Sequence, residues 1–185
     1  GLPQNLDRDF DLLAADGPVI AALLLPSHYV FTPPDADEAR ILAGLEALPL
    51  GALLRLRLPS LSDTDYEVLA RRVLPAAQAA GLKLVLDRDA AMYARTGADG
   101  WHLTSKRLRE TAARPAGLVL ASVHDEEELT LAKQWNADAL VIGAVQSTGT
   151  HPGAAPLGWP RFAQLTRAAS LPTYEEPGLS LRVIV

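Results

Sequence analysis

Short apolar runs alternate along the chain with longer segments in which apolar residues recur at helical spacing. The apolar runs predict strands at residues 27–32, 53–58, 83–87, 100–104, 118–124, 139–145 and 171–174. The segments between them predict helices at residues 37–48, 62–80, 90–96, 108–113, 126–135 and 160–169. Ser62 can cap the clearest of these helices, and Gly81 ends it. Strands that alternate with helices in this way are typical of βαβ units and a parallel sheet.

Two architectures fit this alternation, an open doubly wound sheet and a closed (β/α)8 barrel. A doubly wound nucleotide-binding sheet normally has a glycine fingerprint after its first strand, and none follows residues 27–32. We therefore predict a (β/α)8 TIM-type barrel. Residues 178–185 could form the eighth strand, but no helix separates them from the seventh, as parallel neighbours require. The barrel is thus predicted to be incomplete or irregular at its C-terminal end: it is open, or the tail pairs irregularly, or the C-terminus is not native.

An internal echo supports the alternation. The segments GADGWHL (97–103) and NADALVI (136–142) share one pattern, in which a turn residue and Ala-Asp precede a strand. Gly97 and Asn136 stand where a helix should end, and both residue types adopt the left-handed conformation readily. Both segments are therefore predicted to be helix-to-strand junctions.

Composition limits the classes of protein that the chain can belong to. It has 185 residues, the size of about one domain, and we assign residues 26–185 to the barrel and residues 1–25 to a leader helix or linker. The formal net charge of −5 argues against nucleic acid as a partner. The absence of cysteine excludes disulfides and thiolate sites. The uncharged apolar stretch at residues 17–26 is too short to span a membrane, so we expect a soluble, cytoplasmic domain.

Candidate chemistry gathers where the predicted strands end, which is where barrels of this type carry their active sites. Polar residues at or just after the strand ends are Thr32, Arg55, Arg57, Asp87, Arg88, His102, Lys106, Arg107, Ser122, His124, Thr148, Thr150 and His151. Several cations thus lie around one rim of an acidic protein, and the simplest ligand for them is a phosphate or diphosphate. Lys106 and Arg107 could instead be solvated charges at a helix start.

Four segments resemble the thiamine-phosphate synthase and thiazole tautomerase (TenI-type) superfamily. They are LRLRLPSLSD (54–63), KLVLDRDAAMYARTGADGWHL (83–103), LASVHDEEEL (120–129) and IGAVQSTGTHPGAAPLGW (142–159). The resemblance implies a (β/α)8 barrel that joins an aminopyrimidine diphosphate to a thiazole phosphate and releases diphosphate with Mg²⁺. The chain is most similar to barrels that follow a Nudix hydrolase domain, which implies such a domain in the parent chain and makes residues 1–25 an inter-domain linker.

Several anion-binding positions of the superfamily are kept in this sequence. In the Gln-x-Arg-x-Lys strand motif the resemblance places Arg55 at the Gln, keeps Arg57 and puts Pro59 at the Lys. The serine of the fifth strand is Ser122. The superfamily's other phosphate-binding segments are a Thr-x-Thr-Lys loop and a Gly-Gly turn, which fall on Thr148, Thr150 and His151 and on Pro177 and Gly178. The resemblance therefore implies a binding site for thiazole phosphate and diphosphate on this rim.

The metal ligands that the resemblance implies are replaced. The Asn-Asp pair after the third strand falls on Asp87 and Arg88, and the metal-binding Asp after the fourth strand falls on Arg107. A guanidinium cannot bind a cation, so we predict no metal ligands here, although Mg²⁺ is expected of the superfamily. Arginine could serve instead as an anion clamp in a metal-free pocket.

Three functions stay open from the sequence. The first is a synthase-like enzyme of thiamine biosynthesis. The second is a metal-independent thiazole tautomerase, because SVH at 122–124 resembles the branch in which the histidine, here His124, shuttles a proton. The third is a non-catalytic phosphate-binding domain attached to a Nudix hydrolase. A homo-oligomer is also left open.

Overall fold

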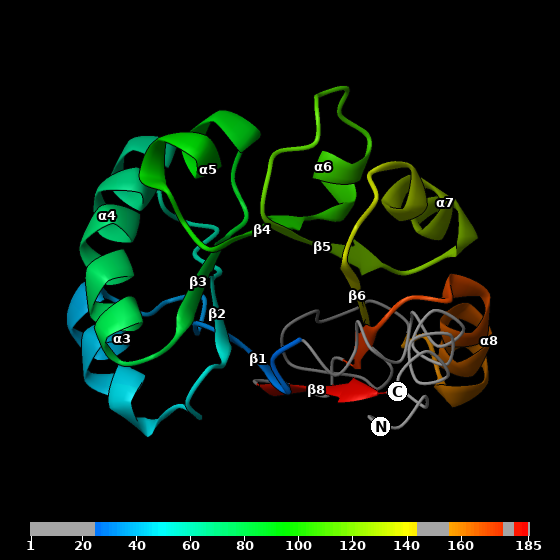
Figure 1. Ribbon diagram of the computed structural model, residues 1–185, viewed down its shortest axis with the longest axis horizontal. Helices are drawn as coiled ribbons and strands as arrows, with labels where there is room; N and C mark the ends of the chain where they lie inside the picture. Colours follow the sequence, from blue (N-terminus) through cyan, green and yellow to red (C-terminus); the bar gives the residue numbers. More distant parts are fainter. Residues whose placement is uncertain (1–24, 144–155, 176–179, 185) are drawn as a thin grey trace, which may run out of the picture.

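Eight strands close into a barrel in the order in which they occur along the chain (Figure 1). In this computed structural model the strands are β1 His28–Phe31, β2 Leu53–Leu56, β3 Lys83–Leu86, β4 Gly100–Leu103, β5 Leu118–Val123, β6 Ala139–Ile142, β7 Thr173–Glu175 and β8 Ser180–Ile184. The structure describes residues 25–143, 156–175 and 180–184. From β1 to β7, each strand is parallel to the next one in sequence, which confirms the predicted α/β barrel.

The predicted irregularity lies in the last strand. β8 is antiparallel to both of its neighbours, β7 and β1, and it closes the barrel between them. An antiparallel neighbour can be reached without the crossover helix that a parallel one requires. Of the three alternatives for the tail, irregular pairing is therefore the one that the structure shows.

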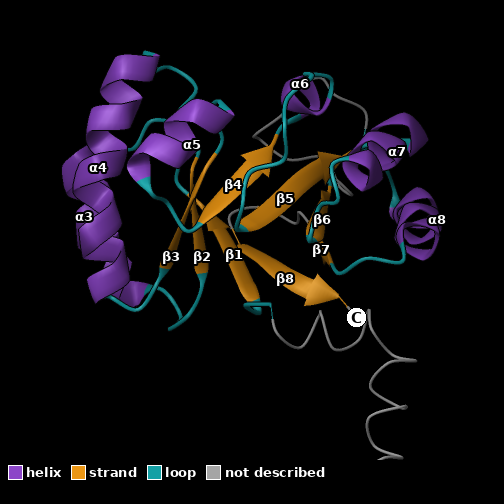
Figure 2. Cartoon of the chain, turned by 45° about the horizontal axis from the view of Figure 1, so that its top comes forward, coloured by secondary structure: helices purple, strands orange, loops and turns teal. Residues whose placement is uncertain are grey.

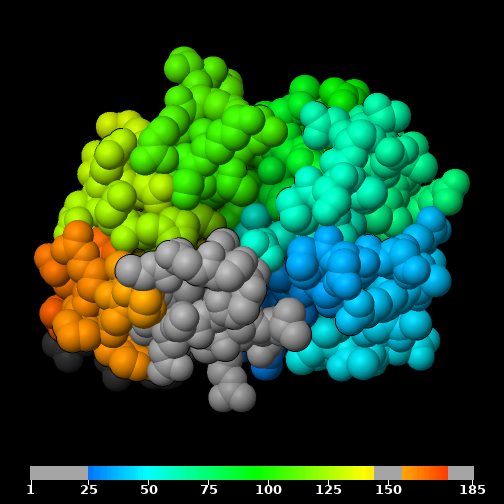
Figure 3. Space-filling view, turned by 180° about the vertical axis from the view of Figure 1, so that it is seen from behind, coloured from blue at the N-terminus to red at the C-terminus, as the bar shows by residue number. Residues whose placement is uncertain are grey.

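The helices lie outside the strands (Figure 2). They are α3 Glu38–Gly44, the 3₁₀-helix η1 Leu45–Ala47, α4 Asp63–Ala79, α5 Ala90–Thr96, α6 Ser105–Leu108, α7 Glu126–Gln134 and α8 Trp159–Ala169. Capping fixes their starts, as the side chain of Ser62 accepts a hydrogen bond from the Asp65 amide and that of Asp125 accepts one from the Glu128 amide. Viewed from behind, the molecule shows the elements in chain order around its circumference (Figure 3).

The helix predicted at residues 108–113 is wrong in position. α6 begins instead at Ser105, because the side chain of Thr104 accepts a hydrogen bond from the Arg107 amide and caps it there. A few residues later Pro115 disfavours helical geometry at the residue before it. The result is a single short turn of helix after β4, followed by an irregular segment that leads to β5.

Two apolar layers lie on either side of the strands. One fills the barrel interior and includes Tyr29, Leu53, Val85, Leu120 and Tyr174. The other packs the outer strand face against the helices and includes Trp101, Tyr66 and Trp135 among its large side chains. Strand residues alternate between these two layers, so the parity of a position decides whether its side chain enters the barrel.

The internal echo is confirmed in detail. Gly97 and Asn136 have φ values of 69° and 51°, which is the left-handed conformation predicted for both. In each copy the following aspartate bonds to the start of the preceding strand: Asp99 Oδ2 accepts from the Leu84 amide at 2.8 Å and Asp138 Oδ2 from the Val119 amide at 2.8 Å. The repeated Ala-Asp is thus a device that aligns two neighbouring strands. Within the described ranges, no helix is long and apolar enough to cross a membrane.

Candidate functional site

A cavity of about 210 Å³ opens at the carboxyl ends of the first strands and at the loops after β4 and β5. Cations, hydroxyl groups, an imidazole and one aromatic ring line it: Phe31, Arg55, Arg57, Thr104, Ser105, Lys106, Ser122 and His124. Four of the predicted site residues therefore meet in one place, namely Arg55, Arg57, Ser122 and His124. Lys106, left open as a solvated charge, also lies on this wall.

Arg55 forms a buried ion pair with Asp87. Nη2 and Nε of Arg55 lie 3.0 and 3.1 Å from Asp87 Oδ2, and the two side chains are only 8% and 11% exposed. The Arg55 guanidinium also lies 4.7 Å from the centre of the Phe31 ring. The charge of Asp87 is thus matched by Arg55, and of these two side chains only Arg55 lines the cavity.

Arg88 and Arg107 do not lie among the residues that line the cavity. Nη2 of Arg88 donates to the carbonyl oxygens of Leu58 and Leu61 at 2.9 and 3.0 Å, so this side chain holds the loop between β2 and α4. Arg107 Nη1 binds both carboxylate oxygens of Glu110 at 2.8 and 3.0 Å. Both arginines are thus committed to the scaffold in this structure.

His124 is held by Glu128, a carboxylate in the first turn of α7. Its Nδ1 lies 2.8 Å from Glu128 Oε2, and its backbone amide donates to the same oxygen. The Glu128 side chain is 6% exposed whereas that of His124 is 44% exposed, so the carboxylate lies behind the ring. Burial raises the pKa of Glu128, but hydrogen bonds from His124 and Ser105 outweigh it and lower the pKa to about 2. The spacing of four residues, one helical turn, is the signal that could have revealed this pair.

Beneath the cavity, Ser122 is bonded to a buried histidine. His102 Nε2 lies 2.7 Å from Ser122 Oγ, and His102 itself has no exposed surface. Burial lowers the pKa of His102 well below its ordinary value, and the charges of Arg55 and Arg57 lower it further. The ring is therefore neutral at physiological pH.

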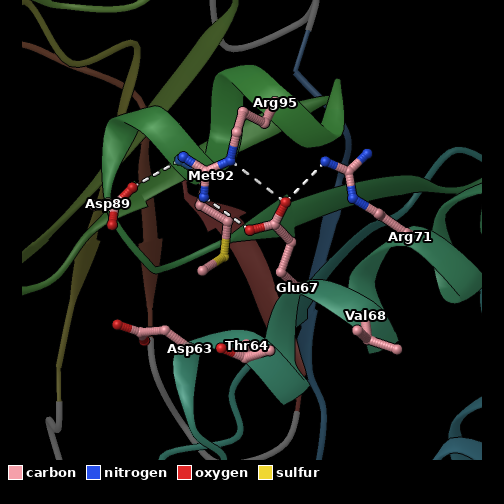
Figure 4. Close-up of a pocket in the computed structure, with 8 residues that line it drawn as sticks. All are labelled: Asp63, Thr64, Glu67, Val68, Arg71, Asp89, Met92 and Arg95. Atoms are coloured by element: carbon pink, nitrogen blue, oxygen red, sulfur yellow. Dashed lines mark hydrogen bonds and ion pairs between the residues drawn. The ribbon is translucent and has the colours of Figure 1, made fainter.

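A second hollow, of about 280 Å³, lies outside the barrel between α4 and α5 (Figure 4). Glu67 bridges the two helices there, because Arg71 and Arg95 each lie 2.8 Å from its carboxylate. Hydrogen bonds from Arg95 and then Arg71 lower the pKa of Glu67 to about 2. The negative charge of Glu67 is paired with the two arginines, so we interpret these residues as a contact that joins α4 and α5.

The fold agrees with the result of comparison with known families. Residues 28–181 match the thiamine monophosphate synthase family. The chain belongs to this family. The thiamine-phosphate synthase of Thermus thermophilus is 33% identical over 133 residues, which cover 70% of this chain and 62% of that protein. The bifunctional thiamine biosynthesis protein ThiM/ThiE of Symbiobacterium thermophilum is 31% identical over 177 residues, or 88% of this chain and 36% of that protein.

The chain spans about three fifths of the length of the Thermus relative. Among solved structures, the thiamine phosphate pyrophosphorylase of Pyrococcus furiosus superposes with a TM-score of 0.62 at 17% identity, covering 80% of this chain and 72% of that chain. A citrate synthase, SbnG, superposes with a TM-score of 0.52 at 14% identity, covering 82% of this chain and 78% of that one. Likeness at such low identity shows the barrel fold alone.

The donor set of this family member does not fit the Mg²⁺ that the resemblance implies. In the described part of the chain, no group of three or more histidine, aspartate or glutamate side chains could hold a metal ion. The two positions at which the resemblance implies metal-binding carboxylates hold Arg88 and Arg107, which carry positive charge, and the neighbouring Asp87 is paired with Arg55. Mg²⁺ requires oxygen ligands, so we derive no step through it.

Four predicted phosphate-binding residues lie outside the described residues: Thr148, Thr150, His151 and Gly178. Their roles stay predictions from the resemblance.

Proposed function

We propose that the rim cavity binds a thiazole phosphate of thiamine biosynthesis and that His124 transfers a proton on it without a metal. The observation that carries this proposal is the His124–Glu128 pair at the edge of a cavity lined by Arg57 and Lys106. Cations and hydroxyl groups bind the phosphate, while the imidazole supplies the acid and base.

The size of the cavity favours one small ligand. Its 210 Å³ lies below the ~300–1,000 Å³ typical of pockets for drug-sized molecules. A single phosphorylated ring suits that volume better than two substrates held together for coupling. Phe31 also lines the cavity, with the Arg55 guanidinium over its ring, and adds apolar surface to a wall that is otherwise polar.

In the proposed reaction, His124 moves one proton between two positions of the ligand ring. No bond to a leaving group breaks, so the reaction requires no release of diphosphate. Glu128 stays ionised, orients the ring through Nδ1 and balances the charge that the imidazole gains when it takes up a proton.

The second candidate is the coupling reaction that the names of the curated relatives describe. It is supported by family membership and by the kept Arg57 and Ser122. The unsuitable donor set for Mg²⁺ argues against it. A non-catalytic phosphate-binding domain attached to a Nudix domain is the remaining alternative.

Two assays on the purified chain test the proposal. The first follows tautomerisation of a thiazole phosphate with and without Mg²⁺, and the second follows release of diphosphate when the aminopyrimidine diphosphate is supplied together with the thiazole phosphate. We expect metal-independent tautomerisation that falls about 100- to 10,000-fold in the His124→Gln variant. The matched control is His28→Gln. His28 begins β1, at the end of that strand away from the cavity.

Turnover that survives in His124→Gln would rule out the role of His124. Diphosphate release that requires Mg²⁺ would establish the second candidate. Ligand binding without turnover in either assay would identify the domain as non-catalytic.

A further inference from the structure

Three side chains from different strands form a chain of hydrogen bonds from the barrel interior to the cavity. The Tyr29 hydroxyl of β1 lies 2.9 Å from His102 Nδ1 of β4, and His102 Nε2 lies 2.7 Å from Ser122 Oγ of β5. Tyr29 and His102 have no exposed surface, whereas Ser122 lines the cavity. Tyr29 and His102 can therefore act on a ligand only through Ser122.

The direction of the protons in this chain follows from its buried end. Burial raises the pKa of Tyr29 well above its ordinary value, so the phenol keeps its proton. Among the described residues, His102 Nδ1 is the hydrogen-bond partner of that hydroxyl. A buried donor without an acceptor is costly, so Tyr29 donates to Nδ1.

The neutral imidazole then has only one arrangement. A neutral histidine carries a proton on one nitrogen and a lone pair on the other. Because Nδ1 accepts from Tyr29, the proton is on Nε2 and is donated to Ser122 Oγ. The serine oxygen is thus already an acceptor, and its own proton is available for another group.

We propose that the Tyr29–His102–Ser122 relay fixes Ser122 as a hydrogen-bond donor toward an anion in the cavity, which makes His102 a positioning residue. This inference rests on the proposed phosphate site. With the opposite direction, Ser122 would donate to His102 and present lone pairs to the ligand. An ionised phosphate offers only acceptors, so the relay selects it over a ligand that itself needs an acceptor.

The first test reads the tautomer without any ligand. The ¹⁵N chemical shifts of the His102 ring distinguish a protonated nitrogen from an unprotonated one. We expect Nε2 to be protonated and Nδ1 to be unprotonated in the unaltered chain. A proton on Nδ1 would overturn the relay, whatever the cavity binds.

The second test compares two substitutions of His102 by calorimetric titration with inorganic phosphate. In His102→Gln the amide oxygen can accept from Tyr29 while its NH₂ group donates to Ser122, so phosphate affinity is retained within about twofold. In His102→Leu neither bond forms, and we expect affinity to fall about three- to tenfold. Both variants remove the ring, so a role in packing alone would weaken both equally and would overturn the proposal.

A third variant shows whether the effect passes through the serine. In a Ser122→Ala background, His102→Leu should cause no further loss of phosphate affinity, whereas an equal further loss would overturn the relay. If the unaltered chain binds no phosphate, both the proposed function and the assignment of Ser122 as its donor are overturned. The ligand-free tautomer then separates that failure from a wrong proton direction.

Discussion

Two pairs of arginines at the carboxyl ends of the strands differ in what they contact. The pair at the end of β2 lines the cavity, whereas the pair after β3 and β4 binds other parts of the protein. Arg55 and Arg57 alternate with Leu56 along one strand, so both enter the barrel and line the cavity. Arg88 and Arg107 lie beyond the ends of their strands and bind scaffold groups, carbonyl oxygens in one case and Glu110 in the other. Strand parity thus places Arg55 and Arg57 at the cavity, whereas the two arginines beyond their strands bind the scaffold.

This difference changes what the lost carboxylates mean. From the sequence, an arginine at each implied metal position could act as an anion clamp in place of Mg²⁺. In the structure these two side chains lie apart from the cavity, and Arg57 and Lys106 supply its outer cations. The two positions at which the resemblance implies metal-binding carboxylates therefore hold arginines that do not line the cavity.

Arg88→Leu should break the scaffold side of the comparison and has the largest expected effect. The substitution leaves two loop carbonyl oxygens without their donor and removes the guanidinium that lies 4.5 Å from the centre of the Tyr66 ring. We expect the free energy of unfolding to fall by about 2–4 kcal/mol in urea denaturation. Phosphate affinity of the folded variant should stay unchanged; weaker affinity at unaltered stability would place Arg88 in the site.

Acid should reveal the carboxylate behind the cavity. The pKa of Glu128 is about 2 in the folded chain against 4.5 ordinarily, so its contribution to stability is complete above pH 4.5 and is lost as the pH falls toward 2. We expect Glu128→Gln to remove about 2–3 kcal/mol of pH-dependent stability across that window. Glu127→Gln, an exposed neighbour, is the control for the pH titration of stability. Equal slopes in the two variants would contradict the assignment.

Arg57→Gln should break the cavity side. Loss of one cation from the wall is expected to weaken binding of inorganic phosphate about tenfold, or about 1.4 kcal/mol, with little change in stability. Arg107→Gln is the matched substitution on the scaffold side, and its affinity should equal that of the natural chain. Titration calorimetry at one salt concentration measures both, and a reversed order of effects would refute the parity argument.

The smallest effect is expected at the exposed clamp between α4 and α5. Glu67→Gln removes the negative partner of Arg71 and Arg95, all of which lie at the surface. Surface ion pairs are screened by salt, so the melting temperature should fall slightly at low ionic strength and match that of the natural chain at about 1 M salt. A loss that persists at high salt would show that Glu67 does more than pair charges.

Local signals predicted most of the barrel. Helix α5 was predicted with its observed bounds, and Ser62, Gly97 and Asn136 were each predicted at an element end, because caps and left-handed residues act through neighbours in sequence. The direction of β8 was not predictable in this way, since it depends on pairing with β1, which is far away along the chain. α6 was misplaced because Thr104 caps it ahead of the apolar residues that suggested it.

The candidate site was predicted in its position and only partly in its members. Rim geometry predicted Arg57, Ser122 and His124 at the strand ends, and all three line the cavity, since a strand's end is a local property. It could not say that Arg88 binds two loop carbonyl oxygens, because that depends on tertiary packing. It did not identify Glu128 either, because the contact between this carboxylate and the His124 ring depends on the first turn of α7.

The antiparallel closing strand has a consequence for how the barrel assembles. The register pairs His28 with Arg182, and the Tyr174 hydroxyl donates to the Pro26 carbonyl across 148 residues of sequence. Every other strand pairing joins segments that follow one another, so those pairings cost little chain entropy to form. We expect the seam between β1 and β8 to close last during synthesis. Until then the open sheet exposes two unpaired edges, and this interval is when the nascent chain is most exposed to aggregation.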